Sequence, residues 1–260
     1  MITSSSNNKI KQVIQLKKKA KARAEAGLFL VEGFKMVEEA LEFGIQEIFI
    51  AESREEEFQK QHNSTLGTLS YEVVGDKLFQ EMSDTVTPQG ILATVKIPKY
   101  SLEDILAKPD GHIIMLENLR DPGNLGTILR SAEGAGATGV ILSKESADIF
   151  NPKVIRSTMG SVFRVPFCYV EDFRDAMRKA KNQGITLYAA HLQGSKEYES
   201  FNYTKPCGFL IGNEANGLTE ETGELADTLI RIPMAGKVES LNAAMAASIL
   251  MFEVARQRRF

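Results

Sequence analysis

Polar side chains that can bind ligands or move protons gather at three points where a predicted strand passes into a predicted helix. The first point carries Asn124 and Arg130, the second Glu214, and the third Ser240 and Asn242. Amide, hydroxyl, carboxylate and guanidinium groups together can order a polar substrate and hold an anion. Open α/β sheets bind ligands beyond the carboxyl ends of their strands, so we expect the three points to share one site.

The first junction spans residues 116–139. A type I turn is predicted at Asp121-Pro122-Gly123, and Asn124 then occupies the position of a helix N-cap. The residues that follow form one apolar stripe at helical spacing: Leu125, Ile128, Leu129 and Ala132. Arg130 lies off this stripe and can face a cleft, where the N–H groups of the helix start favour an anion. An ordinary capped helix with a surface arginine fits the same spacing equally well.

Residues 134–139 match G-x-G-x-x-G, the pattern of a dinucleotide-binding loop. That loop must follow a strand and open a helix. Here the glycines close a predicted helix and lead into a strand, which excludes this assignment and weakens the alternative of a nucleotide-dependent dehydrogenase.

At the second junction, a buried strand ends at Gly212 and a loop over residues 213–217 follows. Thr219 is predicted to cap the next helix, which has glutamates in its first turn. Glu214 therefore stands just beyond the carboxyl end of a strand, where ligands bind. Taken alone, it also fits an exposed glutamate in a polar loop.

At the third junction, a strand ends at Pro233, a flexible loop follows, and Ser240 is predicted to cap a helix over residues 240–257. Small residues at the start of this helix allow close approach of a flat ligand or of another backbone; plain helix packing explains part of this pattern as well. Metal chemistry is not expected, because the three histidines (His62, His112 and His191) lack the spacing of metal ligands.

The composition is that of an ordinary globular protein: 260 residues, 43% hydrophobic, 25% charged and a net charge of −3. No apolar run approaches the roughly 20 residues of a membrane helix. The first residues lack the apolar core of a secretory signal, and two cysteines are too few to staple the chain. We therefore expect free thiols and a cytoplasmic protein.

Residues 1–23 contain seven basic and no acidic side chains, although the whole chain is acidic. Such a cluster can neutralise RNA phosphates, and it can equally be a solvated helix face. The lysines that we expect to bind RNA, together with Arg130, are Lys9, Lys11, Lys17, Lys18 and Lys19.

Alternating helical and strand patterns predict two α/β domains. In the first half, helices are predicted at 8–25, 34–43, 54–61 and 76–82, and strands at 28–33, 45–51, 70–74 and 91–97. In the second half, mostly continuous apolar strands predict a parallel sheet, at 112–116, 139–142, 163–170, 185–190, 207–211 and 228–232, with a helix at 172–183. We predict domains at 1–98 and 111–260, joined by a linker at 99–110 that contains a short helix capped by Ser101 and Asp104.

Together, the three junctions resemble the motifs of the SpoU branch of the SPOUT RNA methyltransferases. The matching residues are Asn118, Asp121-Pro122-x-Asn124-x-Gly126-x-x-x-Arg130-x-Ala132 and Gly136, then Ile211-Gly212-Asn213-Glu214-x-x-Gly217-Leu218, then Ile232-Pro233-Met234 with Ser240-Leu241-Asn242. Residues 7–11, 29–33 and 83–93 are similar to the ribosomal-protein L30e-like substrate-binding domain of this family. One departure is Ala243-Ala244, where bulkier or hydroxylated residues are frequent.

The resemblance implies an α/β fold with a C-terminal trefoil knot, a homodimer, and S-adenosylmethionine held bent in the knot. The implied activity is methylation of a ribose 2′-hydroxyl, and the additional N-terminal domain favours large-subunit (23S) ribosomal RNA. A transfer RNA methyltransferase and a non-catalytic RNA-binding or ribosome-assembly protein on the same scaffold are the alternatives.

The resemblance also implies which residues form the site. Catalytic roles fall to Asn124, Arg130, Glu214, Ser240 and Asn242. Cofactor contacts fall to Leu192, Gly212, Ile232, Met234, Ser240 and Leu241. The resemblance places Arg130 at the reacting hydroxyl, either as a base or as a clamp on the phosphate next to the target ribose. Arginine cannot normally lose its proton, so a base role would need an unusual environment, and we favour the clamp.

Overall fold

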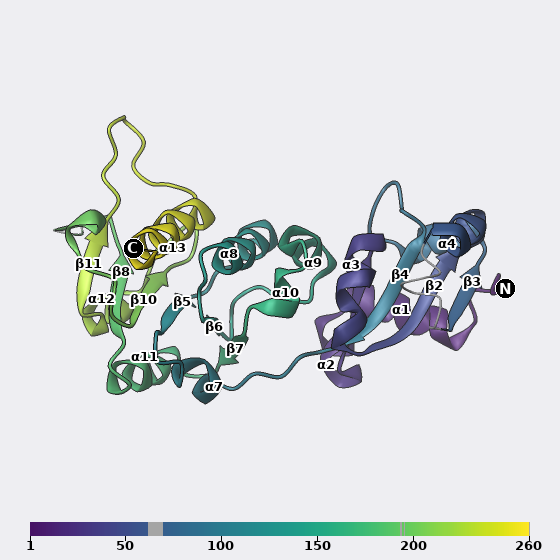
Figure 1. Cartoon of the computed structure of the whole chain (residues 1–260), viewed down its shortest axis with the longest axis horizontal. Coiled ribbons are helices and arrows are strands. Elements are labelled where there is room, and N and C mark those ends of the chain that lie inside the picture. Colours follow the sequence, from purple (N-terminus) through teal and green to yellow (C-terminus); the bar gives the residue numbers. More distant parts are fainter. Residues whose placement is uncertain (62–69, 193, 195, 260) are drawn as a thin grey trace. The chain divides into compact units, whose positions relative to one another are not determined.

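The computed structural model describes residues 1–61, 70–192, 194 and 196–259 of the chain (Figure 1). The chain forms two compact units, and the chain passes between them more than once. The first unit combines Met1–Pro98 with Asp148–Phe163, and the second combines Lys99–Ala147 with Arg164–Phe260.

The first unit is built around a four-stranded mixed sheet in the order β1-β4-β2-β3. β4 pairs antiparallel with β1 and β2, whereas β2 and β3 are parallel. The strands are β1 (Leu28–Glu32), β2 (Ile45–Ala51), β3 (Tyr71–Val74) and β4 (Ile91–Lys96). The helices are α1 (Asn8–Lys18), α2 (Ala20–Ala26), α3 (Phe34–Glu39), η1 (Ala40–Phe43), η2 (Glu52–Arg54), α4 (Glu55–Gln61), α6 (Asp76–Met82), α9 (Pro152–Thr158) and most of α10 (Ser161–Arg164).

The predicted strands of this unit are confirmed to within one residue at each end. The single helix predicted over 8–25 is wrong, because Lys19 adopts an extended conformation and separates α1 from α2. α1 buries Ile10, Val13 and Leu16, which recur every three residues and pack against the sheet. Its other face carries the lysines.

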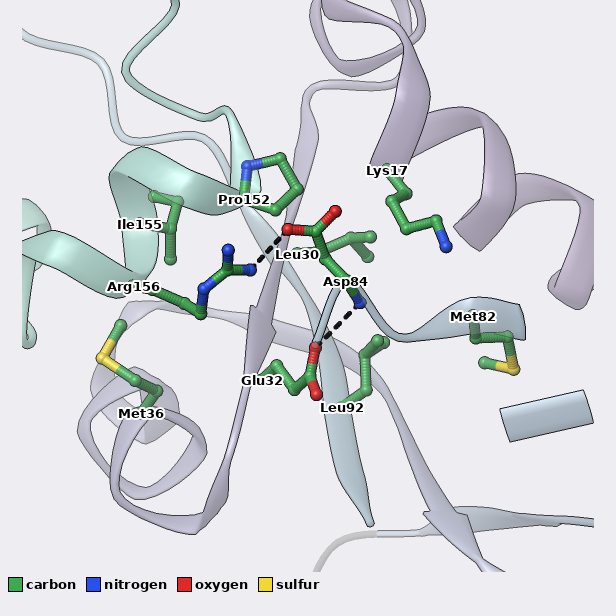
Figure 2. Close-up of a pocket in the computed structure, with 10 residues that line it drawn as sticks. All are labelled: Lys17, Leu30, Glu32, Met36, Met82, Asp84, Leu92, Pro152, Ile155 and Arg156. Atoms are coloured by element: carbon green, nitrogen blue, oxygen red, sulfur yellow. Dashed lines mark hydrogen bonds and ion pairs between the residues drawn. The ribbon is translucent and has the colours of Figure 1, made fainter. Parts of the chain in front are cut away.

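Two ion pairs hold the segment Asp148–Phe163 to the rest of the first unit. Arg23, a residue only 4% exposed, pairs through its guanidinium with the carboxylate of Asp148. Figure 2 shows the second pair, in which Arg156 Nη1 donates to Asp84 Oδ2 at 2.5 Å. A buried arginine needs such a partner, because an isolated charge away from water is costly.

Aromatic rings join the same segment to β1 and η1. The ring of Phe29 lies 4.8 Å from that of Phe150 and 6.0 Å from that of Phe163, and Phe43 stacks on Phe163 at 4.9 Å between centroids. The cavity drawn in Figure 2 encloses only about 20 Å³, room for roughly one water molecule. This region is therefore a packed contact with no space for a larger ligand.

The second unit contains a seven-stranded sheet in the order β7-β6-β5-β10-β8-β11-β9, and every pairing is parallel. The strands are β5 (His112–Leu116), β6 (Gly139–Ser143), β7 (Phe167–Val170), β8 (Thr186–Ala190), β9 (Lys196–Glu197), β10 (Cys207–Ile211) and β11 (Thr228–Arg231). The helices are α7 (Leu102–Leu106), α8 (Pro122–Gly134), α11 (Phe173–Asn182), η3 (Tyr198–Ser200), α12 (Glu220–Leu225) and α13 (Ala243–Arg258). The predicted α/β class and the mostly parallel sheet are confirmed.

Parallel pairing places the carboxyl ends of β5, β10, β8 and β11 at one edge of the sheet. The register sets Leu116 beside Ile211, the last residues of β5 and β10. α8 leaves this edge after β5 and packs against α13 (Figure 1). All three predicted junctions therefore begin at the same edge.

Several local predictions can be checked in this unit. The capping box of Ser101 and Asp104 is confirmed. The strand predicted over 163–170 is wrong in its first half, because residues up to Arg164 are helical and β7 starts only after Pro166, which has no N–H for a sheet. The glycines at 134–139 end α8 and lead into β6, which confirms that they are no dinucleotide loop. Within the described residues, no helix has the length and hydropathy to cross a membrane.

Candidate active site

The start of α8 differs from its prediction by three residues. Asp121 is the N-cap, and its Oδ1 accepts the N–H of Asn124 at 2.7 Å. The predicted N-cap role of Asn124 is therefore wrong. Pro122 occupies the first helical position, where a missing N–H costs nothing. Consequently the side chain of Asn124, buried in the first turn, is free to bond elsewhere.

The start of α13 shows a similar shift. Asn242, not Ser240, caps this helix: its Oδ1 accepts the N–H groups of Ala244 and Met245 at 2.9 and 3.3 Å. Ser240 lies two residues earlier, exposed in the loop before the helix. The Oδ1 of Asn242 is occupied by the cap, so its Nδ2 remains for a second partner.

A chain of side-chain hydrogen bonds connects the three junctions. Asn242 Nδ2 donates to Asn124 Oδ1 at 2.8 Å, and Asn124 Nδ2 donates to Glu214 Oε1 at 3.0 Å. The backbone N–H groups of Asp121 and Arg120 also donate to the Glu214 carboxylate, at 2.9 and 3.2 Å. The side-chain amide oxygen and nitrogen of Asn124 and of Asn242 therefore each have a defined hydrogen-bond partner.

The pKa of Glu214 lies below its usual value of 4.5. Partial burial alone would raise this pKa, but the hydrogen bonds from Asn124 and from the backbone of Asp121 and Arg120 outweigh it. Glu214 is therefore ionised at neutral pH and, as an acceptor of three hydrogen bonds, a weak base. Glu214 is therefore better suited to hold its hydrogen-bond donors in position than to accept a proton.

The loop that carries Glu214 is held at both ends. Asn213 and Gly217 exchange two backbone hydrogen bonds, and Asn213 Nδ2 donates to the carbonyl of Asn118 at 2.8 Å. Gly212 packs directly on the loop's far end: a Cβ there would lie 2.1 Å from the carbonyl carbon of Gly217. Only glycine fits at this close approach of two backbones.

A cleft of about 680 Å³ opens beside Glu214. It lies between the loop that follows β5 and the loop that follows β10. Its lining residues are Asn118, Arg120, Asp121, Pro122, Asn213, Glu214, Ala215, Asn216, Gly217, Leu218 and Thr219. The volume is within the range of small-ligand sites, about 300–1,000 Å³.

The structure joins Asn124, Glu214 and Asn242 directly, but not the other two predicted catalytic residues. Arg130 is exposed on α8, and in the part of the chain that is described it makes no hydrogen bond or ion pair. Ser240 is likewise exposed. Both are available to a ligand, and neither belongs to the hydrogen-bonded chain.

The residues predicted to contact a cofactor follow three neighbouring strands. Leu192 comes after β8, Gly212 after β10, and Ile232 and Met234 after β11, while Leu241 precedes α13. Leu192 is 65% exposed, and the side chains of Ile232, Met234 and Leu241 are half-buried. Apolar side chains left uncovered at a strand edge suit a flat aromatic ligand.

The five lysines predicted to bind RNA fall into two groups. Lys9 pairs with Glu47 and Glu72 at 2.8 and 2.7 Å, and hydrogen bonds from these two carboxylates raise its pKa to about 12. Lys17 donates to the carbonyls of Glu81 and Ser83. The remaining three, which are exposed, are Lys11, Lys18 and Lys19.

Sequence reasoning missed one polar residue next to the site, Glu117. This carboxylate is only 7% exposed and accepts hydrogen bonds from the Thr219 N–H, the Thr219 hydroxyl and the Thr222 hydroxyl, at 2.8, 2.8 and 2.6 Å. It anchors the far end of the loop that carries Glu214 to the end of β5. Its only signal in the sequence is an acidic residue directly after an apolar strand.

Other reactive groups do not form a second site among the described residues. Burial lowers the pKa of His112 to about 4 and raises the pKa of Cys168 and of Cys207 to about 11, so all three are neutral at physiological pH. His62 lies outside the described residues. Within them, no cluster of His, Cys, Asp or Glu could hold a metal ion.

Comparisons with known proteins match both parts of the chain. Residues 111–252 match the sequence model of the SpoU rRNA Methylase family. Residues 7–93 match that of the MRM3-like substrate binding domain.

Individual relatives are similar over nearly the whole length. The 23S rRNA (guanosine(2553)-2′-O)-methyltransferase RlmP of Bacillus subtilis is 31% identical, over 97% of this chain and 98% of its own. The 23S rRNA (uridine(2479)-2′-O)-methyltransferase of Streptomyces viridochromogenes is 33% identical, over 91% and 85%. The crystal structure of the SpoU methyltransferase AviRb from the latter organism, in complex with AdoMet, has a TM-score of 0.87 at 32% identity and covers 97% of this chain and 98% of its own.

Proposed function

Because the chain belongs to the SpoU rRNA Methylase family, we propose that it transfers the methyl group of S-adenosylmethionine to a ribose 2′-hydroxyl of 23S ribosomal RNA. The observation that carries this proposal is the hydrogen-bonded chain of Asn124, Glu214 and Asn242. It draws three distant stretches of sequence to one edge of the sheet.

The residues present fit S-adenosylmethionine. The apolar side chains of Leu192, Ile232 and Met234 follow the adjacent parallel strands β8 and β11, Leu241 precedes α13, and Gly212 follows β10, which lies beside β8. Apolar surface with backbone N–H and C=O groups suits an adenine ring. When bound, this cofactor supplies a methyl group activated by a positive sulfonium.

The chain's own residues then have to align a hydroxyl with that methyl group. Alignment of two reactants is a large part of such catalysis. The charge on Glu214 is spread over three donors, so it fixes Asn124 and the loop after β10 and does not remove a proton. Arg130, exposed and always protonated, clamps the phosphate beside the target ribose with its two-pronged guanidinium.

Residues 1–98 act as the RNA substrate-binding domain in this proposal, joined by residues 99–110 to the methyltransferase domain at 111–260. Lys11, Lys18 and Lys19 supply phosphate contacts, which position the RNA without reading its sequence. Lys9 and Lys17 have partners within the protein and contribute mainly to the fold.

We further propose that the loops beyond β8, β10 and β11 form a trefoil knot, that the enzyme is a homodimer, and that it works in the cytoplasm. Met245 and Phe252, seven residues apart on α13, are 55% and 44% exposed, an apolar face that a second copy can cover. Sedimentation equilibrium tests the dimer, and a monomer at micromolar concentration would contradict it.

Incubation with methyl-labelled S-adenosylmethionine tests the activity. Unmodified ribosomal and transfer RNA are supplied separately, and new 2′-O-methyl groups are mapped by their resistance to alkaline cleavage. Label in ribosomal RNA is the expected result, and label in transfer RNA alone would favour the other substrate. Absence of cofactor binding in calorimetry would favour the non-catalytic scaffold.

A further inference from the structure

The cleft beside Glu214 contains polar side chains that the protein itself does not use. Arg120 lines the cleft, and its guanidinium has no partner among the described residues. The side-chain amide of Asn216 is likewise unpaired there, and that of Asn118 accepts from Ser143 but donates to no described group. Three residues with an unpaired side-chain donor thus line one cavity.

The walls of this cleft are fixed in advance. Asn213 ties one wall to the carbonyl of Asn118, and the buried Glu117 ties the far end of that wall to β5 through Thr219. Asn118 itself has a positive φ of 56°, a conformation that asparagine tolerates better than most residues. Rigid walls with unpaired donors are typical of a binding site, because little ordering remains to be done on binding.

The cleft and the predicted cofactor contacts occupy different parts of the sheet edge. None of Leu192, Gly212, Ile232, Met234, Ser240 or Leu241 lines the cleft. The two parts meet at Gly212, which directly precedes the cleft-lining residue Asn213 and packs on the backbone of Gly217. A reaction between a cofactor and an RNA substrate needs a site for the RNA next to the cofactor site, and the cleft lies in that position.

We propose that this cleft receives the base of the RNA nucleotide whose ribose is methylated, with Arg120 and Asn216 as its specificity-determining residues. The inference rests on the proposed function and deepens it. Proteins that read RNA sequence bind unstacked bases by their hydrogen-bonding edges. Arginine pairs with two acceptors of a base at once, amides both donate and accept, and Pro122 and Ala215 offer apolar contact to a ring.

The test uses the full-length protein, S-adenosylmethionine and unmodified 23S ribosomal RNA, with the variants Arg120→Ala and Asn216→Ala. The control is Arg174→Ala, which removes the same charge from an exposed position on α11. We expect KM for RNA to rise on the order of tenfold in Arg120→Ala and less in Asn216→Ala. Cofactor affinity by calorimetry and melting temperature should match those of Arg174→Ala.

Three results overturn the inference in different ways. If wild type methylates RNA and both variants keep the KM of Arg174→Ala, the cleft does not bind the base, while the proposed function stands. If cofactor affinity falls and KM for RNA is unchanged, the cleft belongs to S-adenosylmethionine. If wild type neither binds the cofactor nor methylates RNA, the proposed function itself fails and this inference falls with it.

Discussion

The two units of the chain use their charged and polar side chains differently. In the first unit, two donors described above have acceptors inside the unit: Lys9 has Glu47 and Glu72, and Arg156 has Asp84. In the second unit, the hydrogen-bonded chain from Asn242 to Glu214 ends beside a cleft lined by unpaired donors. Donors that have an acceptor within the protein stabilise its fold, whereas donors without one, on the fixed walls of a cleft, can bind a ligand.

The largest effect is expected for Gly212→Ala. The new Cβ would lie 2.1 and 2.2 Å from backbone atoms of Gly217 and Leu218, so the loop that carries Glu214 must move. We expect methyl transfer to fall by at least about 100-fold, because small misplacements are costly in aligned sites. Gly184→Ala, away from the site, is the matched control: it meets no atom within 4 Å and carries only the strain of a positive φ, about 1–2 kcal/mol. Equal losses in both variants would show that the close approach is not what matters.

Asn124→Ala should come next. It removes the link between Asn242 and Glu214, so that Asn242 keeps only its cap bonds and Glu214 only its two backbone donors. We expect kcat to fall on the order of 30- to 100-fold and the unfolding free energy by about 1–3 kcal/mol. Single-turnover kinetics and chemical denaturation measure the two quantities, and an unchanged kcat would remove Asn124 from the site.

Arg130→Lys tests the clamp that stands outside the hydrogen-bonded chain. Lysine keeps the charge but loses the two-pronged geometry, so we expect turnover to fall by roughly tenfold with stability unchanged. Melting curves and steady-state kinetics suffice. Near-full turnover and RNA affinity in the lysine variant would contradict a fork-shaped clamp.

The exposed lysines at the N-terminus, Lys11, Lys18 and Lys19, extend this comparison to the first unit. Replacing Lys11, Lys18 and Lys19 together by alanine should weaken RNA binding and reduce the slope of log affinity against log salt by about 0.7–0.9 for each phosphate that the variant no longer neutralises. Lys9→Ala should leave that slope unchanged, because Lys9 is paired with Glu47 and Glu72. If only Lys9→Ala changed the slope, Lys9 would be the residue that contacts phosphate, and the three exposed lysines would not be.

The smallest effects are expected in the pH dependence of unfolding. Glu214 has a lowered pKa, so its stabilisation is present above its usual pKa of 4.5 and is lost as the pH falls through its lower folded value. Lys9 has a pKa raised to about 12, so its stabilisation is complete below its usual pKa of 10.5 and is lost as the pH rises towards 12. Glu214→Gln should flatten only the acid limb of a stability curve and Lys9→Met only the alkaline limb. If Glu214→Gln changed only the alkaline limb, or Lys9→Met only the acid limb, the hydrogen bonds described for these two residues would be contradicted.

Periodicity predicted most of the fold, because buried parallel strands are continuous apolar runs and α1 has a regular apolar spacing. Of its two errors, one has a local cause and the other does not. Pro166 delays β7, and Lys19 interrupts the first helix although no proline or glycine marks the break. The sequence also contains no local sign that Asp148–Phe163 packs with the first unit, since apolar contacts such as Phe29 with Phe150 depend on the whole topology.

The site was predictable as a set of motif residues but not as a network. The residue types at positions 124, 214 and 242 were identified, whereas the caps were misplaced by two or three residues at both helices. Asp-Pro at a helix start is a known signature of N-cap and first turn, and it would have released Asn124 for the role it has. Glu117 and the cleft depend on distances between loops, which no single sequence window contains.

The packing of Asp148–Phe163 on the N-terminal residues has a practical consequence for dissecting this enzyme. A truncation at Pro98 would strip Phe150 and Phe163 of Phe29 and Phe43, and Asp148 of Arg23. The catalytic fragment would then expose aromatic side chains and an unpaired carboxylate in the middle of its chain, and we expect it to aggregate. Separate expression of the two halves is therefore a poor route to their individual activities, and surface-point variants in the intact chain are the better one.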